Sequence, residues 1–234
     1  MIKELRKACS KNEDEPLALR IFRLFSIYLT ALFARIGVSP NFVSLLSIAG
    51  TIIGTVLLML GSYQSMVSGA AVLVFSHQLD YSDGELARYT GKTTTYGAYL
   101  EVLYSNVFYG LVFIGLAVGT YRLLGDVNML WFGMSALLFK FLYRFCDVTK
   151  NTLLKNLNES PRLSPIAADE TSPLYKRVVW EIFWFLFFAP GIVLLVLLFA
   201  IINKLNLLLI FYGVTMPLLF LVQSFFHWLD LRGR

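Results

Sequence analysis

Long apolar runs separated by short polar stretches cover most of the chain. Residues 36–79 contain no Lys, Arg, Asp or Glu, which is enough sequence for two membrane-spanning helices with a turn near residues 61–65. Four more mainly apolar runs are long enough to cross a bilayer once each, at 102–121, 127–148, 182–203 and 205–229. The pattern therefore predicts an all-α integral membrane protein with six transmembrane helices.

A further apolar segment, residues 17–38, is interrupted by three arginines. Ser26 and Thr30 continue the polar side that begins at Arg23, at near-helical spacing, and Gly37 marks the end of the pattern. These features predict an amphipathic helix that lies in the membrane interface. A seventh span is the alternative interpretation.

Basic residues are distributed unevenly about the six predicted spans. With a cytoplasmic N-terminus, the side opposite the cytoplasm receives only Arg122 and Lys204. This asymmetry orients helical membrane proteins, so the net charge of +5 indicates attraction to anionic lipid headgroups rather than nucleic-acid binding. Cys9 and Cys146 predict no disulfide framework or zinc site, and the first 16 residues lack the apolar core of a signal peptide.

A cluster of charged and small residues follows the second predicted span. Asp80 and Asp83 are three residues apart, so they share one face if the helix continues. Gly84, Ala87 and Arg88 extend that face, with small side chains that leave room for a ligand and a guanidinium suited to phosphate. Charge at a membrane boundary costs free energy, so this cluster predicts a functional site.

The next predicted helix carries a matching stripe. Gly97, Glu101 and Ser105 recur every four residues, and Gly97 allows close approach of a neighbouring helix. We expect Glu101 to project toward Asp80 and Asp83. Three carboxylates at a hydrated membrane face favour a hard cation, Mg²⁺ or Mn²⁺, completed by phosphate oxygens and water.

Simpler interpretations of these charges stay open from the residues alone. The carboxylates of the cluster would, in one alternative, only pair with Arg88 and Lys92. His77, one turn before the first aspartate, is expected to be a hydrogen-bonded packing residue. Lys140 and Arg144, one turn apart, are expected either to receive an anionic acceptor or to extend toward lipid headgroups.

Two segments near the C-terminal spans carry weaker signals. Residues 149–175 are polar and contain three prolines, which predicts a cytoplasmic loop that serves as a lid or as a simple connector. Pro190 and Gly191, inside the fifth predicted span, predict a kink.

The charged cluster resembles the signature of the CDP-alcohol phosphotransferases, D-x2-D-G-x2-A-R-x8-G-x3-D-x3-D. Six of its eight fixed positions match at the right spacing, from Asp80 to Gly97. The sequence from Ser39 to Ser44, which includes Asn41, also resembles the start of the first span in that family. The family architecture, an interfacial helix followed by six spans with a cytoplasmic site, agrees with the predicted topology.

The resemblance implies a reaction and a set of roles. Family members transfer the phosphoryl-alcohol part of a CDP-linked alcohol, such as CDP-diacylglycerol, to a hydroxyl acceptor and release CMP, often in phospholipid synthesis. The expected metal ligands, for two ions or one, are Asp80, Asp83 and Glu101. The expected substrate-binding residues are Asn41, Gly84, Ala87, Arg88, Gly97, Lys140 and Arg144. A homodimer is also implied, with residues 1–40 as a cytoplasmic N-terminal segment and 41–234 as the six-helix catalytic domain.

Two departures from the signature place the chemistry in question. Glu101 stands where the family has its third aspartate, and Ser105 stands where the family has the carboxylate taken as general base. A serine hydroxyl neither accepts a proton usefully near neutral pH nor binds metal well. Either Glu101 acts as base, or the acceptor brings its own phosphate or carboxylate, or the protein binds CDP-alcohols without efficient turnover. A small cation or metabolite transporter is a rival from another class, but no internal repeat supports it.

Overall fold

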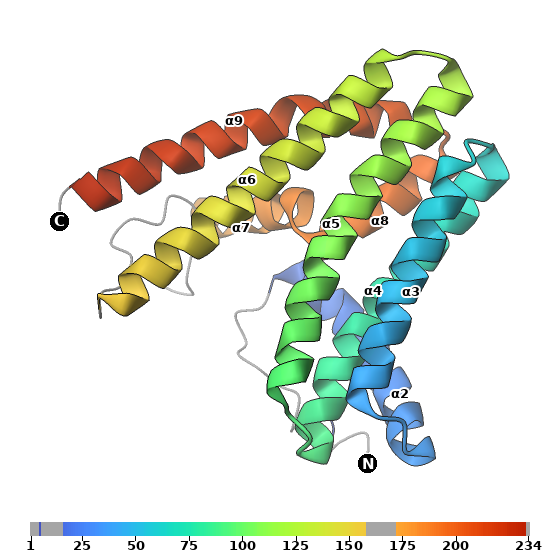
Figure 1. Ribbon diagram of the computed structural model, residues 1–234, viewed down its shortest axis with the longest axis vertical. Coiled ribbons are helices and arrows are strands. Elements are labelled where there is room, and N and C mark those ends of the chain that lie inside the picture. Colours follow the sequence, from blue (N-terminus) through green and yellow to red (C-terminus); the bar gives the residue numbers. More distant parts are fainter. Residues whose placement is uncertain (1–4, 6–15, 158–171, 233–234) are drawn as a thin grey trace.

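The computed structural model describes residues 5, 16–157 and 172–232, and the secondary structure of these residues is entirely helical (Figure 1). The helices in order are α2 (Leu17–Ile36), α3 (Pro40–Met59), α4 (Tyr63–Thr90), α5 (Thr95–Leu124), α6 (Asn128–Asn156), α7 (Leu174–Phe187), α8 (Ala189–Ile201) and α9 (Leu205–Arg232). Helix α3 packs against both α4 and α5, and α6 packs against α9.

Glycines allow α3 to approach its two neighbours closely. A Cβ atom on Gly69 of α4 would lie 2.8 Å from the backbone nitrogen of Leu58 on α3. A Cβ on Gly119 of α5 would overlap the carbonyl oxygen of the same leucine and lie 2.9 Å from Met66 Cε. Close helix approach of this kind is how membrane bundles gain packing contacts without a hydrophobic driving force. The three helices therefore form one tightly packed unit, side by side in Figure 1.

Buried hydroxyl groups add hydrogen bonds inside this unit. The Thr51 and Ser76 hydroxyl oxygens lie 2.8 Å apart across the α3–α4 interface, and the Ser76 hydroxyl also donates to the Ser47 carbonyl. Polar side chains within a membrane bundle are stable where such partners are present. These hydrogen bonds thus fix the position of α4 along α3, in the part of both helices next to their polar ends.

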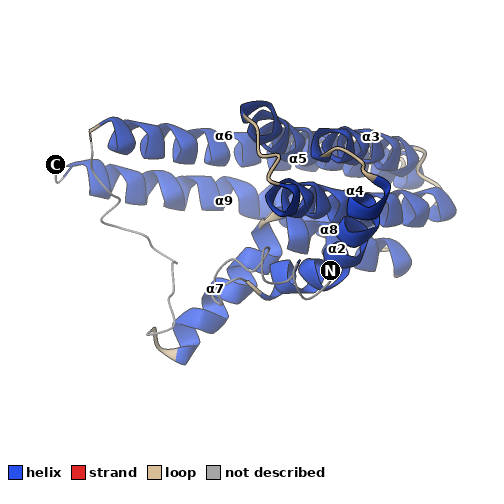
Figure 2. Ribbon diagram, turned by 90° about the horizontal axis from the view of Figure 1, so that it is seen from below, coloured by secondary structure: helices blue, strands red, loops and turns tan. Residues whose placement is uncertain are grey.

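Helices α6 and α9 lie side by side and extend away from the three-helix unit (Figure 2). The Ser135 hydroxyl donates to the Gly213 carbonyl over 2.7 Å in one part of their contact. Near their C-terminal ends Lys150 Nζ lies 2.6 Å from Asp230 Oδ2 in a buried ion pair. Breaking such a pair leaves an uncompensated charge, so it joins the two helices firmly.

The α7–α8 pair is broken at Phe188 with a bend of 65°. Backbone groups released by a helix break need partners inside a membrane. Three helices supply them: Lys140 Nζ donates to the Phe187 carbonyl over 2.6 Å, Tyr212 donates to the Leu186 carbonyl over 2.8 Å, and the Ala189 N–H donates to the Tyr109 hydroxyl over 2.9 Å. The break is therefore a built feature of the fold, and it confirms the kink predicted at residues 190–191.

The prediction of an all-helical membrane protein is confirmed. Five described helices, α2, α3, α5, α6 and α9, are long and apolar enough to cross a membrane, and the bent α7–α8 pair raises this number to six. Helix α4, which contains the second predicted span and the charged cluster, is not among them, whereas α2, predicted to lie in the membrane interface, is. The turn predicted near residues 61–65 is confirmed, since α3 ends at Met59 and α4 begins at Tyr63.

The prediction of a polar loop at 149–175 was wrong in both of its boundaries, because the helices on either side extend into this range. Helix α6 continues to Asn156 and α7 begins at Leu174. The Lys150–Asp230 ion pair and the contact with α9 extend α6 beyond its apolar part. Residues 158–171, on which the choice between lid and connector depends, lie outside the described residues.

Replacement of Gly119 tests the close approach of α3 and α5. We expect Gly119→Ala to lower the free energy of unfolding in detergent by about 1–3 kcal/mol, because the added methyl group overlaps the α3 backbone. Gly110→Ala on the same helix is the matched control, since its Cβ would lie 3.5 Å from the Phe141 ring in ordinary contact. Equal effects of the two substitutions on the unfolding transition would contradict the packing described above.

Candidate active site

A pocket opens on one side of the molecule, where α3 and α5 begin and α4 ends. Its lining consists of Pro40, Asn41, Ser44, Asp83, Gly84, Ala87, Arg88, Lys92, Thr93, Thr94, Gly97, Ala98 and Glu101. Three segments that are distant in sequence contribute: the first turns of α3, the last turns of α4 with the following loop, and the first turns of α5. Helix packing therefore assembles the pocket from residues that span more than one quarter of the chain.

Local sequence signals place each of these segments. The Ser39 hydroxyl accepts from the Phe42 N–H at the start of α3, where Pro40 occupies the first turn. Helix α4 continues through the charged cluster to Thr90 and ends on Gly91 in the left-handed conformation. The Thr94 hydroxyl accepts from the Gly97 N–H and starts α5 after a short loop. Asp80, Asp83 and Arg88 therefore lie on one continuous helix, as predicted.

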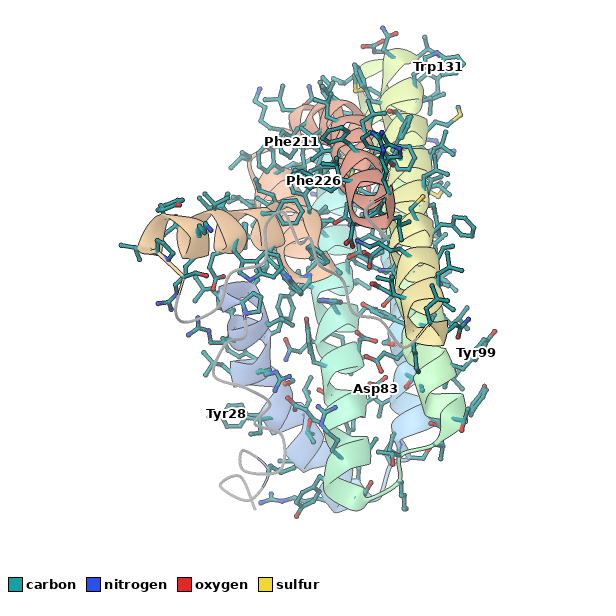
Figure 3. All side chains as sticks on the ribbon, turned by 90° about the vertical axis from the view of Figure 1, so that its left-hand side faces the viewer. Tyr28, Asp83, Tyr99, Trp131, Phe211 and Phe226 are labelled. Carbon is teal, nitrogen blue, oxygen red and sulfur yellow. The ribbon has the colours of Figure 1, made fainter. Side chains whose placement is uncertain are left out.

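Asp83 is the central acidic group of the pocket. Its side chain is only 7% exposed, and Figure 3 shows it on the side of α4 that faces α3 and α5. The Ser44 hydroxyl, the Gly84 N–H and the positive charge of Arg88 are close enough to favour the charged form of its carboxylate. These partners orient a carboxylate that burial alone would disfavour.

Gly84 and Gly97 leave space where larger residues would intrude. A Cβ on Gly84 would lie 3.3 Å from Arg88 Nη1, so the missing side chain makes room for the guanidinium. A Cβ on Gly97 would lie 3.2 Å from Asn41 Oδ1. Asn41, predicted from the start of the first span, thus meets the α5 backbone inside the pocket. The two glycines thus bring the Asn41 amide of α3 and the Arg88 guanidinium of α4 to the same small volume.

The three predicted metal ligands come together only in part. Asp83 and Glu101 line the pocket, whereas Asp80 lies beside it within electrostatic range of both. Among the described residues, no group of three His, Cys, Asp or Glu side chains is arranged to hold a metal ion. One oxygen of Asp80, Oδ1, is buried without a hydrogen-bond partner. An unpaired buried carboxylate oxygen beside two further carboxylates has the donor chemistry that a hard divalent cation requires.

The other predicted site residues lie outside the pocket lining. Ser105 is on α5, one turn beyond Glu101, and is half-buried. Lys140 is buried, its amine donates to the Phe187 carbonyl, and its Nζ lies 4.5 Å from the centre of the Tyr109 ring. Lys140 therefore does not extend to headgroups. The Arg144 guanidinium lies 4.9 Å from the same ring centre, and its Nε is buried without a hydrogen-bond partner among the described residues.

The structure adds residues that the sequence pattern did not identify, and it confirms one packing role. Ser44 lines the pocket together with Asp83, whereas the sequence indicated it only as the last residue of the stretch that resembles the start of the family's first span. His77 Nδ1 lies 2.9 Å from the Tyr104 hydroxyl, and the ring is buried among aromatic side chains, so the prediction of a hydrogen-bonded packing residue is confirmed.

Curated proteins with similar sequences share part of this chain. A phosphatidylinositol phosphate synthase from Streptomyces avermitilis is 37% identical over 100 residues, which cover 43% of this chain and 40% of the relative. An archaetidylinositol phosphate synthase from Pyrococcus horikoshii is 31% identical over 90 residues, 37% of this chain and 44% of the relative. The matched stretch thus spans less than half the length of each of these relatives.

A solved structure and a family model extend the likeness over most of the chain. The crystal structure of Mycobacterium tuberculosis phosphatidylinositol phosphate synthase (PgsA1) with CDP-DAG bound has a TM-score of 0.64 and 17% sequence identity, and covers 87% of this chain and 94% of that chain. At this identity the likeness shows a shared fold. The model of the CDP-alcohol phosphatidyltransferase family matches residues 37–231, from the end of α2 through most of α9. The chain therefore belongs to the CDP-alcohol phosphatidyltransferase family.

Proposed function

We propose that the protein transfers the phosphoryl-alcohol group of a CDP-linked alcohol to a hydroxyl acceptor and releases CMP, in the synthesis of a phospholipid or a related phosphodiester. The observation that carries this proposal is the pocket itself. Five residues that match the family signature, Asp83, Gly84, Ala87, Arg88 and Gly97, line it together with Glu101, which stands at the position of the third aspartate. Their convergence, from two helices and across a loop, supports one binding site for the CDP group.

The pocket residues support binding of a pyrophosphate. Arg88 presents a planar set of donors that suits phosphate oxygens, and Lys92 adds a second positive charge at the rim. Gly84, Ala87 and Gly97 keep side chains out of the space beside these donors. In the proposed reaction these groups hold and orient the leaving CMP, because positioning supplies much of the catalysis of phosphoryl transfer.

The family uses divalent metal ions, and we propose Mg²⁺ or Mn²⁺, as two ions or one. Asp80, Asp83 and Glu101 would hold the metal. When bound, a divalent cation would neutralise negative charge on the pyrophosphate. The buried, unpaired Oδ1 of Asp80 supports this assignment. Ser44 would keep the Asp83 carboxylate oriented toward the pocket.

The proton acceptor is the part of the mechanism that departs from the family signature. Ser105 occupies the expected position of the base and carries no carboxylate. We assign the role to Glu101, which lines the pocket one turn earlier on the same helix. The alternative source of a base is an acceptor that carries its own phosphate or carboxylate. A second candidate function, binding of CDP-alcohols without efficient turnover, is favoured by the missing carboxylate at position 105.

The acceptor proposed here bears a phosphate group, such as an inositol phosphate. Both curated relatives are named as synthases of a lipid-linked inositol phosphate, which supports an inositol phosphate acceptor here. In this chain Arg144 is the residue proposed to receive the acceptor phosphate, because its buried Nε has no partner among the described residues. Lys140 is placed one turn away, but its amine donates to the Phe187 carbonyl. We therefore assign Lys140 an indirect part, as the cation that fixes the helix break beside Arg144.

The cellular arrangement is proposed from the charge asymmetry of the sequence. The pocket would open to the cytoplasm, residues 1–40 would form a cytoplasmic segment with an interfacial helix, and 41–234 would form the catalytic domain. At least one of the two substrates would be a lipid that reaches the site from the membrane. A homodimer is proposed from family membership.

Release of CMP by the purified protein in lipid nanodiscs tests the proposed function. With Mg²⁺, CDP-diacylglycerol and inositol phosphate, we expect CMP to appear, and with EDTA or in Asp83→Asn we expect the rate to fall by at least about a hundredfold. Ser65→Ala, in the first turn of α4 and away from the pocket, is the control variant. A panel of phosphorylated and unphosphorylated alcohols identifies the acceptor. Nucleotide binding without CMP from any acceptor would favour the non-catalytic candidate.

Restoring the carboxylate at position 105 separates the alternatives for the base. If Glu101 or the acceptor already supplies the base, we expect Ser105→Asp to lower kcat, because an added negative charge disturbs a site adapted to its absence. Ser105→Asn, which is similar in size but uncharged, controls for steric effects. A large rise in the rate of CMP release in Ser105→Asp alone would identify the natural protein as catalytically impaired.

A further inference from the structure

The two halves of the broken α7–α8 pair differ in how far the bundle covers them. Of the 14 residues of α7 only Phe187, the last, is buried, whereas six of the 13 residues of α8 are buried. Figure 2 shows α7 leaving the bundle on the side away from α6 and α9. Five apolar side chains of α7 are each at least 46% exposed: Leu174, Tyr175, Val178, Val179 and Ile182.

The length of α8 places the helix break inside the membrane. The Tyr63 hydroxyl, at the start of α4, donates to the Ile201 carbonyl over 3.0 Å, so α8 ends on the side of the molecule opposite the pocket. The 13 residues of α8 are about 20 Å long, which is less than the roughly 30 Å of a bilayer core. Phe188 therefore lies within the core, where Lys140 and Tyr212 supply hydrogen bonds to the carbonyls at the break.

The bend makes α7 rise slowly from this depth. The 14 residues of α7 are about 21 Å long, and a bend of 65° from an upright α8 reduces their rise to about 9 Å. Together with α8 this rise gives about 29 Å, close to the thickness of the core. Helix α7 therefore runs obliquely through the leaflet on the pocket side and reaches the headgroups at its N-terminal end, which carries Lys176 and Arg177.

The charged side chains of α7 divide between the protein and its surroundings. Glu181 is the one acidic residue of α7, and it faces α2: the Leu17 N–H donates to Oε2 over 2.8 Å, and Arg20 Nη2 lies 3.7 Å from Oε1. This carboxylate occupies the N-terminus of α2, which has no side-chain hydrogen bond from its own N-cap. Lys176 and Arg177 are exposed. The charge that α7 leaves exposed is thus positive, which suits anionic lipid headgroups.

Helix α2, which α7 contacts through Glu181, also presents an apolar side outward. Four of its apolar side chains are more than half exposed: Leu24, Phe25, Tyr28 and Leu32. Figure 3 shows Tyr28 pointing away from the bundle. The polar side of α2 is turned toward α4, where the Ser26 and Thr30 hydroxyls donate to the Glu85 carboxylate, each over 2.8 Å. Helix α2 thus fastens the contact with α7 to the three-helix unit.

We propose that α7 is a membrane-surface helix that inserts its apolar side into the pocket-side leaflet and binds anionic lipid headgroups through Lys176 and Arg177. A lipid surface is the partner that fits, because it accepts apolar side chains along a helix and basic side chains at its boundary. The fifth predicted span is then formed by α8 and an oblique α7 together, in place of one straight helix. This role is independent of the proposed transferase activity, because it concerns how the protein lies in the bilayer.

Spin labels measure the depth of α7 in lipid nanodiscs. Nitroxide labels are attached at Leu174, Val178 and Ile182, which follow one exposed side of the helix, in a chain whose two cysteines are replaced by serine. The access of oxygen and of a polar nickel complex to each label gives its depth. We expect the three depths to span about 5 Å, as a helix bent by 65° from the membrane normal implies, whereas an upright helix would give about 12 Å.

Labels on α9 are the matched control. Leu207 and Val214 are about half exposed on a helix that is long and apolar enough to cross the membrane. We expect the label at Val214 to lie about 8–10 Å deeper than the label at Leu207. A spread of about 12 Å among the α7 labels would overturn the proposal. Exclusion of both reagents from α7 would reveal a second protein chain on it, and access of the nickel complex alone would place α7 in water; either result also overturns the proposal.

Quenching by lipids tests the basic pair. A fluorophore at Val179, one turn after Lys176, is quenched by phosphatidylglycerol or by phosphatidylcholine that carries a nitroxide high on its acyl chain. We expect the anionic lipid to quench at least about threefold more strongly, and this preference to disappear in Lys176→Gln/Arg177→Gln. Lys204→Gln, between α8 and α9 on the opposite side, is expected to leave the preference unchanged. Equal quenching by both lipids in the natural sequence, or an equal loss in Lys204→Gln, would overturn the assignment of the headgroup contact.

Discussion

The close approach of α3 to α4 and α5 is the contact on which the site depends. Gly69 and Gly119 let the backbones of α4 and α5 reach the same turn of α3, at Leu58. Side chains at these positions would separate the helices along their length, and the polar ends that form the pocket would separate with them. A packing constraint in the apolar part of the bundle thus sets the distances between charged groups at its end. None of the described residues of α6 and α9 lines the pocket; these two helices pack against each other, and α6 also packs against α5.

Satisfaction of polar groups explains most of the remaining architecture. The carbonyl groups at the α7–α8 break receive hydrogen bonds from Lys140 and Tyr212, and the buried oxygens of Glu85 receive theirs from α2. At the pocket this rule is relaxed, since Asp80 Oδ1 and Arg88 Nε are buried without partners among the described residues. Unsatisfied groups of opposite charge beside one pocket are consistent with a site adapted to a charged ligand and its counter-ion.

Much of the fold and part of the site followed from sequence because the signals were local. Charge-free runs predicted the spans, and spacings of three and four residues correctly placed Asp83 and Arg88 on one face of α4 and Gly97 and Glu101 on α5. The errors came from tertiary contacts that no local pattern encodes. The role of Lys140 at the helix break depends on Phe187, far along the chain, and the length of α6 depends on its contact with α9. For the same reason the link between α2 and Glu85 was not predicted.

A crystal structure with ligand tests the central claim most directly, namely that the ends of α3, α4 and α5 bind the CDP group beside a metal held by acidic side chains. Crystals grown with CDP-diacylglycerol and Mn²⁺, with data collected near the manganese absorption edge, would locate both. The account predicts cytidine diphosphate density between Asn41, Arg88 and Gly97, and an anomalous peak beside Asp80, Asp83 and Glu101. Nucleotide density at another place, or manganese peaks remote from these carboxylates, would contradict it.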